Sequence, residues 1–170
     1  MKSYIALLRG INVGGKNIVP MATLRERLTE IGLSDVKTYV QSGNLVFGSS
    51  GFSRNELAEE IRKAMVSAFD VAPAVVILSK LEMERAVKST PFWHGEAEDN
   101  QIHLFFLDAI PERHCVGAAL ALASETEECQ LLGQVFYLSA PDGIARSKLA
   151  SRVQKLLGVG ATARILWSSR

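Results

Sequence analysis

The sequence is poor in cysteine. Its 170 residues include only Cys115 and Cys129, and neither belongs to a Cys-x-x-Cys pair. A disulfide framework or a structural zinc site needs more thiols at closer spacing. The histidines, His94, His103 and His114, show no metal-ligand spacing either. We therefore predict that the protein binds no metal and is suited to the reducing environment of the cytoplasm.

The sequence also lacks a long apolar run. The stretch 102–110 is far shorter than the roughly 20 residues that cross a bilayer, and it contains His103 and Asp108. The first residues, Met-Lys-Ser-Tyr-Ile, lead directly into a strand-like run, so no signal peptide is expected. With 48% hydrophobic and 22% charged residues, the chain has the composition of a globular protein. We expect no membrane partner and a cytoplasmic location.

Local patterns in the first half predict the order β-α-β-β-α-β. The first helix begins at Pro20 and ends at Gly32, and the second begins at a Ser53-Arg-Asn-Glu56 capping box and ends before Pro73. The predicted strands are 3–9, 36–41, 45–47 and 74–78. A second capping box, Ser79-Lys-Leu-Glu82, opens a connecting helix that ends near Thr90.

The same order recurs in the second half. Strands are predicted at 102–107, 128–132, 135–139 and 163–167, and helices at 111–123 and 145–157. The fold class predicted is α+β, with tandem ferredoxin-like βαββαβ halves packed together and joined by a connecting helix. The predicted domains are 1–79, a connecting helix and linker at 80–101, and 102–170.

Short matches between the halves suggest a duplication. The first pair is Gly43-Asn-Leu-Val-Phe and Gly133-Gln-Val-Phe-Tyr. The second pair is Gly51-Phe-Ser-Arg-Asn-Glu-Leu-Ala and Gly143-Ile-Ala-Arg-Ser-Lys-Leu-Ala. Gly43 and Gly133 are therefore expected at equivalent hairpin turns.

Four segments resemble the bacterial domain of unknown function 1697 family. They read Ala6-Leu-Leu-Arg-Gly-Ile-Asn-Val-Gly-Gly-Lys-Asn, then Val19-Pro-Met, then Thr38-Tyr-Val-Gln-Ser-Gly-Asn, then Pro141-Asp-Gly-Ile-Ala-Arg-Ser-Lys-Leu. The resemblance covers nearly the whole chain and implies a two-halved α+β fold. It implies no activity. The residues after Arg164 depart from the family pattern, which has an Asn-Trp pair there.

The net charge of +1 hides a lopsided distribution. Residues 1–50 carry six Lys or Arg against three acids, and residues 130–170 carry six against one. The acidic segment, residues 96–129, carries one Arg against eight acids. This segment can be a solvated surface, a docking surface for another protein, or the counterpart of an anion-binding face made by the basic ends.

The loop 10–19 nearly fits the phosphate-loop pattern. Gly10-Ile-Asn-Val-Gly-Gly15-Lys16-Asn17 has Asn17 where a hydroxyl residue would bind magnesium, and Pro20 places the helix start beyond Lys16. Nucleotide hydrolysis is therefore disfavoured. Two interpretations stay open: a Gly-rich connection, or a loop whose backbone N–H groups hold an anion.

A second basic feature follows Gly143. Arg146, Ser147 and Lys148 are predicted at the start of the helix 145–157, where basic side chains oppose the helix dipole. A bound anion would resolve this conflict, although the side chains can also simply reach solvent. We expect Gly14, Gly15 and Lys16 to approach this corner and form a positive cleft with it.

Sequence-specific RNA recognition and Cys–His catalysis are both disfavoured. A βαββαβ RNA-binding module stacks bases on aromatics of its central strands, beside basic residues. Here that basic-aromatic signature is absent, and the strand aromatics alternate as core residues do: Tyr4, Phe47, Phe105, Phe106, Phe136 and Tyr137. His114 and Cys115 are helix neighbours about 100° apart, which predicts a poor nucleophile–base pair.

These patterns lead to three hypotheses for function. The first is a module that binds an anionic small molecule or nucleic acid, the second is a metal-independent enzyme acting on an anionic small molecule, and the third is a protein-interaction or regulatory role. No catalytic residue is identified and no cofactor is expected. We expect a monomer or a small homo-oligomer. The candidate ligand-binding residues are Arg9, Asn12, Gly14, Gly15, Lys16, Asn17, Tyr39, Gln41, Arg146, Ser147, Lys148 and Arg164.

Overall fold

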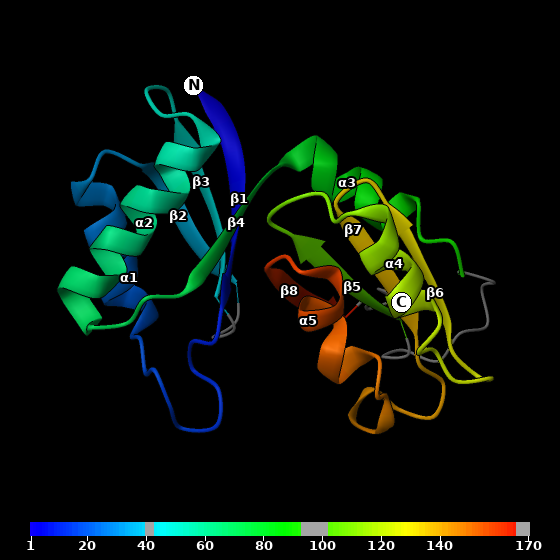
Figure 1. The fold of residues 1–170 in the computed structure, drawn as a ribbon. Helices are drawn as coiled ribbons and strands as arrows, with labels where there is room; N and C mark the ends of the chain where they lie inside the picture. Colours follow the sequence, from blue (N-terminus) through cyan, green and yellow to red (C-terminus); the bar gives the residue numbers. More distant parts are fainter. Residues whose placement is uncertain (40–42, 93–101, 166–170) are drawn as a thin grey trace, which may run out of the picture. The chain divides into compact units, whose positions relative to one another are not determined.

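The computed structural model describes residues 1–39, 43–92 and 102–165. These residues form an α+β protein with two four-stranded antiparallel sheets and five α-helices (Figure 1). They divide into two compact units, Met1–Glu84 and Arg85–Arg170. None of the helices in the described ranges has the length and apolarity of a membrane span.

The first unit has its strands in the order β2-β3-β1-β4. Its elements are β1 (Lys2–Arg9), α1 (Met21–Glu30), β2 (Ser34–Tyr39), β3 (Asn44–Ser49), α2 (Arg54–Phe69) and β4 (Ala74–Ser79). The predicted elements of this half are confirmed, with ends shifted by one to three residues. The predicted end of the second strand, at Gln41, lies outside the described residues.

The helices α1 and α2 cover one face of this sheet (Figure 1). Apolar residues recur every three or four positions along both helices, so each presents an apolar stripe to the strands. The buried cluster joins Leu24 and Leu28 of α1 and Leu57, Ile61 and Met65 of α2 to Ala6, Leu8, Leu45, Phe47 and Ile77 of the sheet. Each large side chain buried in this way contributes about 1.5–3 kcal/mol.

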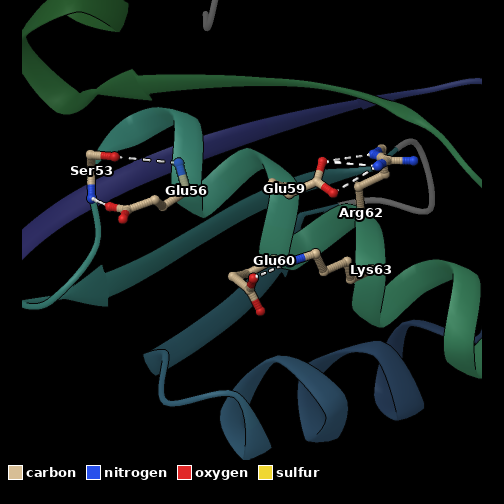
Figure 2. Close-up of polar contacts among 6 residues, drawn as sticks. All are labelled: Ser53, Glu56, Glu59, Glu60, Arg62 and Lys63. Carbon is tan, nitrogen blue, oxygen red and sulfur yellow. Dashed lines mark hydrogen bonds and ion pairs between the residues drawn. The ribbon is translucent and has the colours of Figure 1, made fainter.

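The capping box predicted at the start of α2 is confirmed. The Ser53 hydroxyl accepts from the Glu56 N–H at 3.4 Å, and the Glu56 carboxylate accepts from the Ser53 N–H at 2.7 Å (Figure 2). One turn further on, Glu59–Arg62 and Glu60–Lys63 form exposed ion pairs. Exposed pairs of this kind are screened by water and stabilise a helix weakly, so the cap is the stronger local determinant.

The second predicted capping box is also present, at the start of α3 (Lys80–Lys88). The Glu82 carboxylate accepts from the Ser79 N–H at 2.8 Å, and the Ser79 hydroxyl accepts from the Glu82 N–H at 3.2 Å. Glu82 also binds Arg54, the first residue of α2, at 2.7 Å. One carboxylate therefore ties together the starts of two helices that lie 28 residues apart in the chain.

The second unit repeats this element order, with strands in the order β6-β7-β5-β8. It contains β5 (Ile102–Leu107), α4 (Arg113–Leu120), β6 (Glu128–Leu132), β7 (Val135–Ser139), α5 (Val153–Leu157) and β8 (Ala161–Ile165). Every residue of the central strand β5 is buried. The core of this unit joins Phe105, Phe136 and Leu138 of the sheet to Val153 and Leu157 of α5.

The helix predicted over 145–157 is wrong in its first half. Two short 3-10 turns, Ile144–Arg146 and Ala150–Arg152, precede α5. Ser147 separates them with an extended backbone, and its hydroxyl accepts from the Ala150 N–H at 2.9 Å. A serine side chain that competes with the backbone in this way interrupts a helix. The helix predicted at 111–123 is also shorter, Arg113–Leu120.

The hairpin glycines Gly43 and Gly133 have positive φ values of 77° and 59°. Only at Gly43 does the surrounding structure also exclude a side chain. A Cβ there would lie 2.8 Å from the Leu8 Cβ and 3.1 Å from Ile11, whereas a Cβ at Gly133 would meet nothing within 4 Å. The first turn is therefore packed against the end of β1, and the second is open.

This difference makes Gly43→Ala the more damaging of two matched substitutions. We expect it to lower the free energy of unfolding by about 2–5 kcal/mol, because left-handed strain and overpacking add. Gly133→Ala is expected to cost only about 1–2 kcal/mol, from strain alone. Urea denaturation of both variants measures the difference, and equal losses would contradict the packing of Gly43.

Because of Glu82, we expect the free energy of unfolding to fall when the solution is made acidic. Burial raises the pKa of Glu82, but hydrogen bonds from Arg54 and Ser79 outweigh it and bring the pKa from 4.5 to about 2. Because the folded pKa is depressed, the stabilisation is complete above a pH of about 4.5 and is lost as the pH falls toward about 2.

Glu82→Gln should therefore destabilise the protein clearly at neutral pH and little at the acid end of this range. Urea denaturation across the range measures the effect. Glu84→Gln is the matched control, since the contact of Glu84 within the described residues is an exposed pair with Lys80 at 3.7 Å. If the two variants lose stability equally at every pH, the role of Glu82 is refuted.

Candidate functional site

The loop 10–19 of the first unit contains a tight turn at its tip. The Lys16 N–H donates to the Val13 carbonyl at 3.0 Å, and the two residues between them, Gly14 and Gly15, both have positive φ. This combination defines a mirror-image turn that glycine adopts without strain. The N–H groups of Gly14 and Gly15 donate to no acceptor in the described part of the chain.

Two asparagines hold the base of this loop. The Asn12 amide side chain binds both backbone groups of Val19, accepting from its N–H at 2.7 Å and donating to its carbonyl at 3.0 Å. The Asn17 side chain donates to the Gly10 carbonyl at 2.7 Å. Asn12 and Asn17 therefore hold the loop together. Its exposed residues include Lys16 and the two glycines, and also the apolar Val13 and Ile18.

Arg9, Lys16 and Tyr39 are exposed side chains of the first unit. Arg9 ends β1 and Tyr39 ends β2, and the Leu8 N–H donates to the Gly43 carbonyl at 2.8 Å, which brings the end of β1 to the hairpin. Gln41 lies outside the described residues. Since α1 begins at Met21, Lys16 is not on its first turn, as the sequence predicted. This placement differs from that of the lysine in a nucleotide phosphate loop.

The second unit contains a pocket of about 330 Å³. It lies where the chain leaves β7, and its lining combines one cation, two carboxylates and two hydroxyls. The lining residues are Ser124, Glu127, Ala140, Asp142, Gly143, Arg146 and Ser147. Two candidate residues from the sequence, Arg146 and Ser147, are thus brought together here, whereas Lys148 and Arg164 do not line the pocket.

A turn after Gly143 positions the cation. Gly143 has a φ of 94°, and its carbonyl accepts from the Arg146 N–H at 3.0 Å, which closes a single 3-10 turn. Arg146 ends this turn with an exposed side chain, and Ser147 beside it is 7% exposed. The helix-dipole conflict expected from the sequence is absent, because α5 begins only at Val153.

A chain of hydroxyls leads to one of the carboxylates. The Thr126 hydroxyl donates to Asp142 Oδ2 at 2.6 Å, and the Ser124 hydroxyl lies 3.3 Å from Thr126 Oγ1. Since the Thr126 proton is used on Asp142, Ser124 is the donor in the second bond. The Ser124 N–H also donates to Glu127 Oε2 at 2.9 Å.

Sequence reasoning did not find Ser124, Glu127 and Asp142. One local signal was present, because Ser124-Glu-Thr-Glu127 is a Ser-x-x-Glu pattern. It marks a tight turn and nothing more. The contact between Thr126 and Asp142 joins residues 16 apart across two connections, and no local pattern encodes it.

Arg164 belongs to β8, where it pairs with Leu104 of β5. Burial lowers the pKa of its guanidinium, and one of its nitrogens donates to the Ala163 carbonyl at 2.8 Å. Arg164 is not among the residues that line the pocket.

Comparison with known proteins gives a family for the chain. A family model described as a protein of unknown function, DUF1697, matches residues 1–137. The chain belongs to this DUF1697 family. The family resemblance seen in the sequence is thereby confirmed. The matched range includes Ser124 and Glu127 and ends before Ala140.

A solved structure is similar over nearly the whole chain. It is that of a conserved bacterial protein from Streptococcus pneumoniae, with 24% sequence identity and a TM-score of 0.73. The match covers 96% of this chain and 92% of that one. At this identity the likeness shows a shared fold. No curated protein matches the chain.

Glu112, His114 and Cys115 form a line of polar contacts at the start of α4 in this DUF1697 protein. Cys115 Sγ lies 3.4 Å from His114 Nε2, and His114 Nδ1 lies 3.2 Å from Glu112 Oε2. The prediction that the two side chains are poorly placed for contact is therefore wrong, since the Cys115 sulfur and the His114 ring nitrogen lie within hydrogen-bonding distance. Glu112 and His114 are largely exposed, at 79% and 76%, so water competes for these contacts.

The other cysteine is in a different environment. Burial, and then the Glu127 carboxylate, raise the pKa of the Cys129 thiol.

No group of three or more potential metal ligands occurs among the residues that the structure describes.

We expect Cys115 to react faster than Cys129 with iodoacetamide at neutral pH. The reactive species is the thiolate, and burial and Glu127 disfavour it at Cys129. At Cys115, His114 Nε2 lies 3.4 Å from the sulfur and can hydrogen-bond to it. Peptide mass spectrometry over a time course measures both rates in one sample. His114→Gln should slow Cys115 and leave Cys129 unchanged. Equal rates in the unmodified chain would contradict this difference.

Proposed function

We propose that this protein is a binding module for a small ligand with an anionic group, held at Arg146. One observation carries the proposal: Arg146 lines the pocket, and its guanidinium pairs with no carboxylate or other acceptor within residues 1–39, 43–92 and 102–165. A guanidinium presents a planar set of donors that matches a carboxylate or phosphate. An unpaired one at a pocket wall is suited to a ligand of that kind.

Two further features support a small ligand. The pocket volume of about 330 Å³ lies in the range of small-molecule sites. The Ser147 hydroxyl accepts from the Ala150 N–H, which fixes its position, and its own proton finds no acceptor in the described structure. Ser147 is thus a positioned donor beside Arg146, and both can bind the same anionic group.

We propose the loop 10–19 of the first unit as a separate site for an anionic ligand. Arg9, Lys16 and the free glycine N–H groups supply positive potential, and Tyr39 supplies an exposed aromatic face. Such a surface suits phosphates and bases of a nucleic acid. Asn12 and Asn17 support this site because they hold the loop. Lys148 and Arg164 are further cationic candidates within the second unit. The role of Gln41 in ligand binding stays a prediction, because this residue lies outside the described ranges.

An enzyme is the second candidate function. The line of Glu112, His114 and Cys115 favours it, because a thiol beside a histidine that is oriented by a carboxylate is the usual form of an activated nucleophile. Turnover of a bound ligand that Cys115→Ser abolishes would place this function first.

We also propose a ferredoxin-like origin for the two units. The shared element order and strand order support a duplication, with proposed boundaries at 1–79, 80–101 and 102–170. The second unit departs from the first where a five-residue helix replaces the 16-residue α2. A cytoplasmic location fits the two unpaired cysteines.

Binding is tested by thermal denaturation with phosphate esters and carboxylates. A ligand at a hundredfold excess over its Kd should raise the Tm by about 5–10 °C. Arg146→Ala should abolish the rise, and added salt should reduce it. Arg152→Ala is the matched control, because Arg152 is an exposed arginine of the same segment that does not line the pocket. A broad panel without any stabilisation that depends on Arg146 would refute the proposal.

A further inference from the structure

The charges around the pocket indicate which kind of anionic ligand it takes, if the proposed function holds. Arg146 faces the same cavity as Glu127 and Asp142, so the lining carries a formal charge of −1. Neither carboxylate forms an ion pair with a lysine, arginine or histidine of the described chain. A ligand with only negative charge would therefore be attracted at one wall and repelled at another.

The hydrogen-bond directions on the acidic wall are fixed. The Ser124 proton goes to Thr126 and the Thr126 proton goes to Asp142, so Ser124 Oγ offers only lone pairs to the cavity. Glu127 accepts one bond, from the Ser124 N–H, and ionised carboxylates accept several. This wall consists of acceptors and needs a donor from the ligand.

The opposite character is found on the other wall. The Arg146 guanidinium can only donate, and the Ser147 hydroxyl has its proton available while its oxygen is occupied by the Ala150 N–H. One pocket thus combines a donor wall, made by Arg146 and Ser147, with an acceptor wall, made by Ser124, Glu127 and Asp142.

We propose that the ligand is a zwitterion, with a protonated primary amine on the acceptor wall and a carboxylate or phosphate on the donor wall. An ammonium group has three donors and one positive charge, which complements three acceptor side chains. The anionic group then pairs with Arg146, as in the proposed function on which this inference rests. A small amino acid or an aminoalkyl phosphate has this chemistry.

A metal ion fits this pocket less well than an amine. The adjacent guanidinium would repel a cation that has no anionic partner of its own, and the lining offers two carboxylates where a cation site usually has more oxygen ligands. An ammonium group joined covalently to an anion avoids this repulsion, because the anion occupies Arg146.

Matched pairs of ligands test the proposal. O-phosphoethanolamine is compared with ethyl phosphate, and β-alanine with propionate, by titration calorimetry on the full chain. Within each pair the anion is kept and only the amine is removed. We expect the amine to increase affinity about tenfold or more, the effect of a charge-assisted hydrogen bond.

The double variant Glu127→Gln with Asp142→Asn should remove this preference and leave the binding of ethyl phosphate equal or tighter. Both substitutions keep an amide oxygen that accepts from Ser124 or Thr126, so the turn is retained, and an unchanged Tm without ligand confirms it. Glu125→Gln is the matched control, since Glu125 lies in the same turn and does not line the pocket.

Three results would overturn the inference, and they have different consequences for the proposed function. If both members of each pair bind equally and Arg146→Ala abolishes both, the zwitterion is wrong and the anion site stands. If ethanolamine binds as well as O-phosphoethanolamine and Arg146→Ala has no effect, the pocket is a cation site and both proposals are wrong. If none of the probes binds at all, both proposals are also wrong.

Discussion

Each sheet is organised by a central strand whose last residues are hydrogen-bonded to a hairpin turn. In the first unit the Leu8 N–H donates to the Gly43 carbonyl at 2.8 Å, and in the second the Leu107 N–H donates to the Gln134 carbonyl at 2.9 Å. A slip of one residue would move every side chain of the strand to the opposite face of its sheet. These two bonds continue the β1–β3 and β5–β7 pairings into the hairpin turns, at the point where the following connections begin.

The two connections that leave these points are built differently. After β1, the loop 10–19 closes on itself through Asn12 and Asn17 and presents its tip to solvent. After β5, Asp108 turns back to the sheet: its carboxylate accepts from the Gly160 N–H at 2.8 Å, and its own N–H donates to the Gly160 carbonyl. The same strand arrangement thus supports an outward loop in one unit and a closed connection in the other.

The fold brings charged residues from the acidic and the basic segments of the chain into one pocket. The acidic segment, residues 96–129, contributes Glu127 to the pocket, and the basic last quarter contributes both Arg146 and Asp142. Counting charge by segment separates these residues into regions of opposite sign. The pocket brings them together, so its selectivity depends on their arrangement around one cavity and not on the excess of either sign.

The sequence by itself determined the structural features that depend on residues within about four positions of one another. The strands follow from alternation and flanking turn residues, and both capping boxes follow from a serine and a glutamate three residues apart. The break at Ser147 was missed although its partner, Ala150, is close, because an apolar spacing suited to a helix does not reveal that a hydroxyl will compete for the backbone.

Only the tertiary structure decided the contacts between distant residues. Glu82 meets Arg54, Thr126 meets Asp142, and the side chains of Arg146 and Glu127 share a pocket because strands and turns far apart in the chain are packed into one unit. Such contacts depend on the path of the whole backbone. A pattern read over a few residues carries no information about that path, since the free energy that fixes it comes from the buried cores of the two units.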